Sequence, residues 1–201
     1  MIAELLRVPR LAGPRDVPVK KWRDGESRTP TYGYRFWRVT DDGALIAPYY
    51  THGAEHVETL DVHPAPCPNG CADSPGPCGG CGITVLPEAH HLEVIRPIMD
   101  THPRVCGQVA AARVRLVPPV HWTPDLIVRP GTETGSGLPI VARRGNPTVP
   151  EARAAGVRIE ALQLAPRFAH LTDTLTHRYG LPVDISDDLT ALAEEEPWPT
   201  H

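Results

Sequence analysis

The sequence predicts an α+β fold, in which a mainly antiparallel β-sheet carries a zinc-binding loop and one or two short helices. Three features predict this fold: an aromatic β-hairpin pattern near residue 40, an amphipathic helix pattern that ends near residue 180, and four closely spaced cysteines. The chain has 24 prolines and 17 glycines among its 201 residues. This share of about a fifth is above the usual ~12% for the pair, so we expect many loops and no long helix.

The hairpin pattern occupies residues 32–50. Residues 32–39 have the β-prone sequence Tyr-Gly-Tyr-Arg-Phe-Trp-Arg-Val, Asp41-Asp42-Gly43 supplies a turn, and residues 44–50 form a second β-prone run. Because side chains alternate along a strand, one face carries Tyr34, Phe36 and Arg38, and the other carries Arg35, Trp37 and Val39. We expect the aromatic side chains to pack a core; a stacking surface for nucleic-acid bases is the alternative.

Alternation predicts more strands further along the chain. Residues 106–117 form a candidate strand, and residues 126–128 and 138–142 form two short ones. The first has one face made of Val109, Ala111, Arg113 and Arg115 and another made of Ala110, Ala112, Val114 and Leu116. Residues 157–164 form the last candidate strand, with Val157, Ile159, Ala161 and Gln163 on one face and Arg158, Glu160, Leu162 and Leu164 on the other.

Two segments have helical spacing. Residues 87–100 place Leu92, Val94, Ile95 and Met99 near one side, and Pro97 is expected to kink or end that helix. The run that starts at Pro166 places Phe168, Leu171, Leu175 and Tyr179 on one stripe. Gly180 and Pro182 follow this run, as is typical after the last turn of a helix.

The composition changes along the chain predict three parts. Residues 1–30, rich in proline and charge, form an extended N-terminal arm; residues 31–183 form a single α+β domain with a zinc loop at 63–82; and residues 184–201 form an acidic C-terminal tail.

Charge and hydropathy narrow the possible partners. The formal net charge is −4, so no basic surface of the kind that selects a phosphate backbone is expected. No segment has the length of a signal peptide's apolar region or the roughly 18 apolar residues of a membrane span. Five cysteines, four of them clustered, fit a reducing compartment. We expect a cytoplasmic protein that has a macromolecular partner and no membrane partner.

The cysteine cluster predicts one structural Zn²⁺ site. Its spacing is C-x3-C-x6-C-x2-C, and all four thiols lie within fifteen residues. Thiolates on two short glycine-containing turns can converge on zinc at about 2.3 Å, and four of them leave no open position for water. The predicted ligands are Cys67, Cys71, Cys78 and Cys81.

Other interpretations of the cluster stay open. His63 is an alternative ligand that would replace one cysteine and give a site of three thiolates and one imidazole. An iron–sulfur cluster also uses four thiolates but has other usual spacings. A proline-rich loop with no metal is the remaining alternative. Cys106, at the start of a candidate strand, is expected to be a buried apolar residue.

One pair of motifs raises the possibility of catalysis. His56-Val57-Glu58 has the form H-x-E, and residues 77–81 have the form P-C-x-x-C, as in zinc deaminases. In those enzymes zinc keeps an open position and the glutamate moves protons. The twenty or so residues between the two motifs here are too few for the strand-helix-strand segment expected between them, and Cys67 and Cys71 would have no role.

Several short motifs resemble a known group of proteins. The run Tyr-Arg-Phe-Trp-Arg-Val at 34–39 is followed by Asp42-Gly43, a His-x-x-Pro segment and Cys-x-x-Cys-Gly-Ile, and the motif Arg-Tyr-Gly-Leu-Pro-Val lies at 178–183. These motifs resemble uncharacterised actinobacterial and actinophage proteins that carry a Tyr-Arg-x-Trp-Arg strand and a Cys-x-Cys-Gly-Ile/Leu-Tyr-Ala box. Their Gly-x-Val strand is matched by Gly107-Gln108-Val109. This chain departs from the box in having C-x2-C and Thr84 in place of Tyr. The resemblance implies a small β-rich domain and supplies no activity.

These observations predict a binding function and not catalysis. The expected protein is a zinc-stabilised module that contacts another macromolecule, a protein more readily than a nucleic acid. A zinc-dependent hydrolytic, deaminase-like enzyme is the first alternative. A nucleic-acid-binding zinc ribbon is the second, and it would need six arginines to gather on one face: Arg35, Arg38, Arg113, Arg115, Arg143 and Arg144.

Overall fold

The computed structural model describes residues 20–22, 30–47, 56–57, 59–64, 71–75, 81–101, 107–123 and 151–193. Within this part of the chain, nine strands form one mixed sheet that is accompanied by two short α-helices and two 3₁₀ helices. The strands are β1 (Lys20–Trp22), β2 (Tyr32–Val39), β3 (Leu45–Ile46), β4 (His56–Val57), β5 (Asp61–Val62), β6 (Ile83–Val85), β7 (Val109–Thr123), β8 (Glu151–Leu164) and β9 (Val183–Ile185). The helices are α1 (His90–Thr101), η1 (Pro166–Leu171), α2 (Thr172–Tyr179) and η2 (Leu189–Leu192). The predicted α+β class is confirmed.

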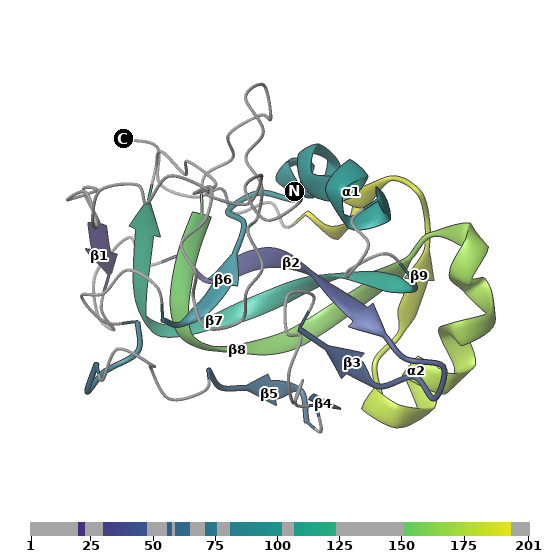
Figure 1. Cartoon of the computed structure of the whole chain (residues 1–201), viewed down its shortest axis with the longest axis horizontal. Coiled ribbons are helices and arrows are strands. Elements are labelled where there is room, and N and C mark those ends of the chain that lie inside the picture. Colours follow the sequence, from purple (N-terminus) through teal and green to yellow (C-terminus); the bar gives the residue numbers. More distant parts are fainter. Residues whose placement is uncertain are drawn as a thin grey trace, which may run out of the picture.

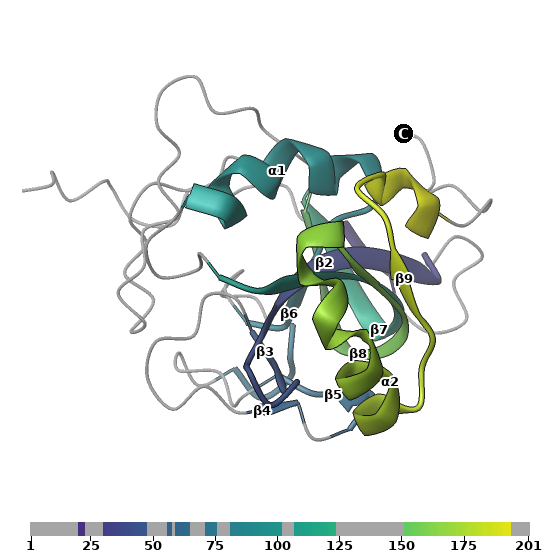
Figure 2. The ribbon, with the colours of Figure 1, turned by 90° about the vertical axis from the view of Figure 1, so that its right-hand side faces the viewer.

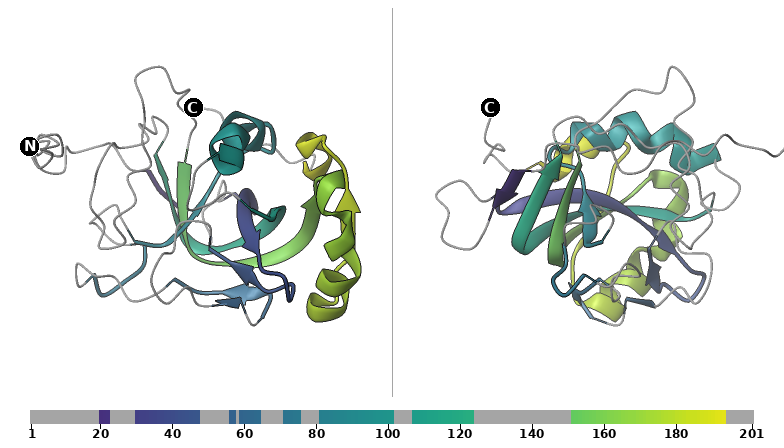
Figure 3. Two further views of the ribbon diagram at one scale, coloured as in Figure 1. Left: turned by 45° about the vertical axis from the view of Figure 1, so that its right-hand side comes forward. Right: turned by 60° about the vertical axis from the view of Figure 1, so that its left-hand side comes forward.

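The long strands β7 and β8 are the centre of the sheet (Figure 1). The strand order is β4-β3-β2-β7-β8-β5; in addition β1 pairs with β7, and both β6 and β9 pair with β8. The β8–β9 pair is parallel and the other described pairs are antiparallel. Figure 3 shows from two further directions how β7 and β8 curl together.

Backbone hydrogen bonds join four strands into a closed ring. β2 pairs with β7, β7 with β8, and β8 with β6. Leu86, which follows β6, then pairs with Tyr34 of β2 through two backbone hydrogen bonds of 2.8 and 2.7 Å. We call this arrangement the strand ring. Gly33 permits its closure, because a Cβ atom there would lie 2.8 Å from Cγ2 of Val85.

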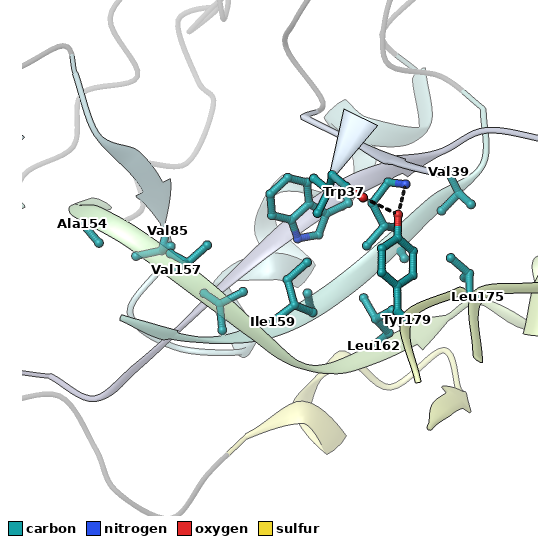
Figure 4. Packing of buried hydrophobic residues seen from close by; sticks show 14 of the residues in the cluster. Trp37, Val39, Val85, Ala154, Val157, Ile159, Leu162, Leu175 and Tyr179 are labelled. Carbon is teal, nitrogen blue, oxygen red and sulfur yellow. Dashed lines mark hydrogen bonds between the residues drawn. The ribbon is translucent and has the colours of Figure 1, made fainter. Parts of the chain in front are cut away.

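The interior of the strand ring is apolar and includes the aromatic strand predicted from the sequence. Trp37 is 1% exposed and lies among aliphatic side chains of β7 and β8 (Figure 4). We call this cluster the inner core. Its buried members are Trp37, Val39, Leu45, Val57, Val85, Ala110, Ala112, Val114, Leu116, Val120, Ala152, Ala154, Val157, Ile159, Leu162, Leu164, Leu171, Leu175 and Tyr179.

The opposite face of β2 packs under α1, which crosses above the sheet in Figure 2. We call this second cluster the outer core, with buried members Tyr34, Phe36, Leu86, Ala89, Leu92, Met99, Val109, Ala111, Leu189 and Leu192. The predicted separation of the two faces of β2 is therefore confirmed. Pro97 was expected to kink or end this helix; α1 continues through Pro97 to Thr101, so the second of these two expectations is wrong. Met99, 1% exposed in the outer core, ties the last turn to the sheet.

The predicted faces of residues 157–164 are wrong beyond Ile159. Val157 and Ile159 share the inner core with Leu162 and Leu164, whereas Ala161 packs against the outer core. The cause is a β-bulge: Val114 pairs with Ile159 and Arg113 with Ala161, which leaves one extra residue on β8. One inserted residue exchanges the faces of every later side chain.

Helices η1 and α2 follow the predicted run from Pro166. Leu171, Leu175 and Tyr179 are buried in the inner core. Gly180 ends α2 with φ of 66°, the left-handed conformation that favours glycine at this position. The Tyr179 hydroxyl accepts a hydrogen bond from the backbone N–H of Leu45 at 2.8 Å and donates one to the carbonyl of Val57 at 2.9 Å (Figure 4). One side chain thus ties α2 to the β3–β4 ladder.

Two elements lie outside the expected domain limits of 31–183. β1, from the segment expected as an arm, adds to the edge of β7. η2, from the segment expected as an acidic tail, buries Leu189 and Leu192 in the outer core. Gln163, 1% exposed, holds this end of the chain by donating hydrogen bonds to the carbonyls of Ser186 and Asp188. The candidate strands at 126–128 and 138–142 lie outside the described residues.

The variant Tyr179→Phe tests the tie between α2 and the β3–β4 ladder. We expect it to lower the free energy of unfolding by roughly 1–3 kcal/mol, because a buried N–H and a buried carbonyl lose their partner. Urea unfolding followed by tryptophan fluorescence measures this change. Tyr32→Phe is the control, since the Tyr32 hydroxyl accepts its bond from Arg115 at an exposed site where water can replace it. Equal losses from the two variants would contradict the assignment.

Candidate functional site

The two ends of the cysteine loop lie on the same edge of β8. β5 leads into the loop and pairs Val62 with Val157. β6 leads out of it and pairs Ile83 with Ala154. β7 occupies the other edge of β8, so β5 and β6 lie one after the other along a single edge. The loop therefore leaves the sheet and returns to it within a few residues of β8.

His63 lies against the backbone of Gly156 at this point. A Cβ atom at Gly156 would lie 3.1 Å from the Nδ1 atom of His63 and 3.1 Å from the carbonyl oxygen of Val62. Glycine therefore gives the imidazole its close approach to β8. Gly156 was not predicted as part of the site, although a single glycine beside a predicted strand is a known signal of close backbone approach.

The other end of the loop is packed against the same strand. Gly82 has φ of 97°, and a Cβ atom there would lie 3.0 Å from both the Ala154 carbonyl oxygen and Cβ of Pro75. Pro75 is buried, and Cys81, which precedes Gly82, is 6% exposed. The described part of the loop is thus folded back onto the beginning of β8.

Two of the four predicted ligands lie within the described residues, and two lie outside them. Cys71 is half-buried and Cys81 is buried. Cys67 and Cys78 lie outside the described residues, as does Cys106. Among the residues that are described, no group of three or more His, Cys, Asp or Glu side chains could hold a metal ion. The four-cysteine site and its variant with His63 stay predictions.

The two deaminase-like motifs fall on separate elements. His56 belongs to β4 and pairs with Ile46 of β3, whereas Cys81 precedes β6 on β8. Glu58 and Cys78 lie outside the described residues.

A second group of titratable side chains lies at the start of α1. Nδ1 of His90 is 3.0 Å from a Glu88 carboxylate oxygen, and the rings of His90 and His91 are 4.1 Å apart. His91 is 9% exposed, and its Nδ1 atom has no hydrogen-bond partner within the described structure. Burial lowers the pKa of His91, the charge of His90 lowers it further, and Glu88 opposes both effects. The environment of His91 in the first turn of α1 therefore disfavours the protonated imidazole.

The arginines proposed for nucleic-acid binding do not share one face. Arg35 lies with its guanidinium carbon 4.0 Å from the ring centroid of Trp37, on the inner face of β2, whereas strand alternation puts Arg38 on the outer face. Arg113 and Arg115 both lie over the ring of Tyr32, and Arg115 also pairs with Glu160. The remaining two, Arg143 and Arg144, lie outside the described residues.

The fold and the loop define an α+β protein with a mixed sheet and a cysteine-rich segment set into one sheet edge. Comparison with protein-family models, curated proteins and solved structures gave no match to this chain. The resemblance to actinobacterial and actinophage proteins stays a prediction. None of the described helices has the length and apolar character that crossing a membrane requires.

The low pKa of His91 predicts a pH dependence of stability. The unfolded chain takes up a proton at this side chain below about pH 6.5, while the folded chain resists it. The stability is therefore fully present above pH 6.5 and falls as the pH drops below that value. The urea concentration at the unfolding midpoint should decrease between pH 7.5 and pH 5.5, and we expect this decrease to be smaller in His91→Phe. The measurement is made with EDTA present, so that metal release does not contribute.

His170→Gln is the matched control, since His170 is an exposed histidine of η1. It should leave the pH dependence unchanged. If the unfolding midpoint of His91→Phe depends on pH as strongly as that of the wild type, another group causes the pH dependence.

Proposed function

We propose that the protein is a zinc-stabilised binding module for another macromolecule, in which the cysteine loop holds one Zn²⁺ through thiolates. The proposed ligands are Cys67, Cys71, Cys78 and Cys81. The observation that carries this proposal is the closure of the loop on β8, with Cys81 buried at its base next to the turn at Gly82. A short closed loop brings thiols that are close in sequence close in space.

The chemistry of the residues supports zinc. A buried thiolate needs a nearby positive charge, and Zn²⁺ supplies two while it removes the thiol protons. A site with four thiolates is closed to water, so its zinc orders the chain and does no chemistry. His63 is the alternative fourth ligand, since its ring lies at the base of the same loop against Gly156.

The charge distribution supports a protein partner over a nucleic acid. Several exposed or half-buried arginines already pair with carboxylates: Arg115 with Glu160, Arg158 with Asp61, Arg178 with Asp42, and Arg96 with Asp187. A phosphate backbone would have to displace these carboxylates. With a net charge of −4, the chain has no surplus of cations to favour that exchange.

Metal content tests the zinc site. We expect one zinc per chain by inductively coupled plasma mass spectrometry and, in the Cys106→Ala background, four thiols that react only after denaturation. Cys81→Ser should lose most of the zinc, because a neutral hydroxyl is a much poorer zinc ligand than a thiolate. Cys106→Ala is the matched control and should keep it, since Cys106 lies outside the cluster.

The outcomes separate the alternatives. If the variant His63→Gln retains zinc, the four thiolates are the ligands. If this variant loses zinc, and the chain with His63 present has only three protected thiols, His63 is a ligand. Zinc bound with an open position would favour the deaminase-like alternative. A purified chain without metal would refute the proposed site.

Binding to labelled single-stranded DNA and RNA tests the class of partner. We expect no saturable change in fluorescence anisotropy at micromolar protein in 50 mM salt. Binding that weakens steeply between 50 and 200 mM salt would instead support the nucleic-acid alternative.

A further inference from the structure

We propose that the cysteine loop is an 18-residue insertion, residues 64–81, in one otherwise continuous edge strand, and that the strand ring folds without it. The insertion contains all four clustered cysteines. Zinc would then order a separable binding element and would not hold the fold together. This last point rests on the proposed function, whereas the insertion itself rests on the strand registers alone.

The registers of β5 and β6 define the insertion. Val62 pairs with Val157 and Ile83 with Ala154, both antiparallel and on one edge of β8. Two residues of β8, Ala155 and Gly156, lie between these partners. An uninterrupted strand would therefore need two residues between Val62 and Ile83, but the chain has twenty, which leaves 18 as an excess.

The registers of β5 and β6 indicate which two residues continue the strand. The β5 register, extended by one residue, puts His63 opposite Gly156, where its ring and the Val62 carbonyl are the nearest atoms to the position of a Cβ. The β6 register, extended by one residue, puts Gly82 opposite Ala155. Joining His63 to Gly82 thus restores a strand with both flanking registers unchanged.

The packing on either side of the insertion supports its separability. Leu60, Val62 and Ile83 pack against the inner core, and Val85 is part of it. Leu86 makes the pair that closes the strand ring. Among the described residues, neither core contains a cysteine. Among the described residues of the insertion, Pro75 lies against Gly82 and Cys81 is 6% exposed, so removal of the insertion uncovers surface beside Gly82 and the beginning of β8.

The test is the excised variant that lacks residues 64–81. We expect a cooperative thermal transition within about 5 °C of the metal-free parent, the near-ultraviolet circular dichroism signal of buried Trp37, and no bound zinc. Absence of a cooperative transition would contradict the proposal.

A second deletion provides a matched control. Removal of residues 64–80 keeps Cys81 between His63 and Gly82, so three residues must fill two places. This forces a bulge or a one-residue slip, and a slip would turn Val85 out of the inner core. We expect this variant to melt lower than the one that lacks 64–81, although it deletes less. The reverse order would overturn the register argument.

A measurement on the intact chain tests separability without a deletion. After zinc removal with a chelator, amide hydrogen exchange should accelerate within residues 64–81 and stay slow in β7 and β8. Exchange that accelerates equally in β7 and β8 would show that zinc holds the ring together and would refute the proposal. If the purified chain contains no zinc, the proposed function fails, yet the two deletion variants still decide whether the insertion is separable.

Discussion

The antiparallel pairing of β7 with β8 is the interaction on which the other elements depend. β7 carries β1 and β2 on one edge, and β8 carries β5, β6 and β9 on the other. A change of register between the two long strands would displace all five shorter ones. The bulge opposite the step from Arg113 to Val114 adjusts this pairing, so that β8 supplies side chains to both cores.

Closure of the strand ring limits which side chains fit inside. Trp37 fills much of the interior, and the approach of β6 to β2 leaves no space for a side chain at Gly33. Two buried side chains form hydrogen bonds at the ends of the packed region: the Tyr179 hydroxyl joins α2 to two strands, and the Gln163 amide N–H groups donate to the carbonyls beside η2. These bonds fix the helices against the sheet, because burying such groups without partners would be costly.

The cysteine loop joins two strands whose partners on β8 are only a few residues apart, so the sheet needs only a very short connection there. One end lies at Gly156 and the other against Ala154, Pro75 packs at the base, and neither core contains a cysteine among the described residues. Under the proposed function, a metal bound there would order the segment that carries the ligands, while the cores stabilise the sheet. Under the same proposal, the loop would contact the partner without a loss of stability in the sheet.

The local structures could be predicted from the sequence: the β2–β3 hairpin, α1, the run from Pro166 to Tyr179, and the class of the fold. These follow from alternation, helical spacing and glycine turns, which act between near neighbours. The bulge in β8, the closure of the strand ring and the contact of His63 with Gly156 could not, because they arise from the pairing of distant strands. β5 and β6 have two and three residues, too few for a periodic pattern, and they exist because β8 offers its edge. The cysteine spacing suggested the candidate ligands, but the place of their loop on the sheet depends on strand pairs that are 67 to 97 residues apart in sequence, which no local pattern encodes.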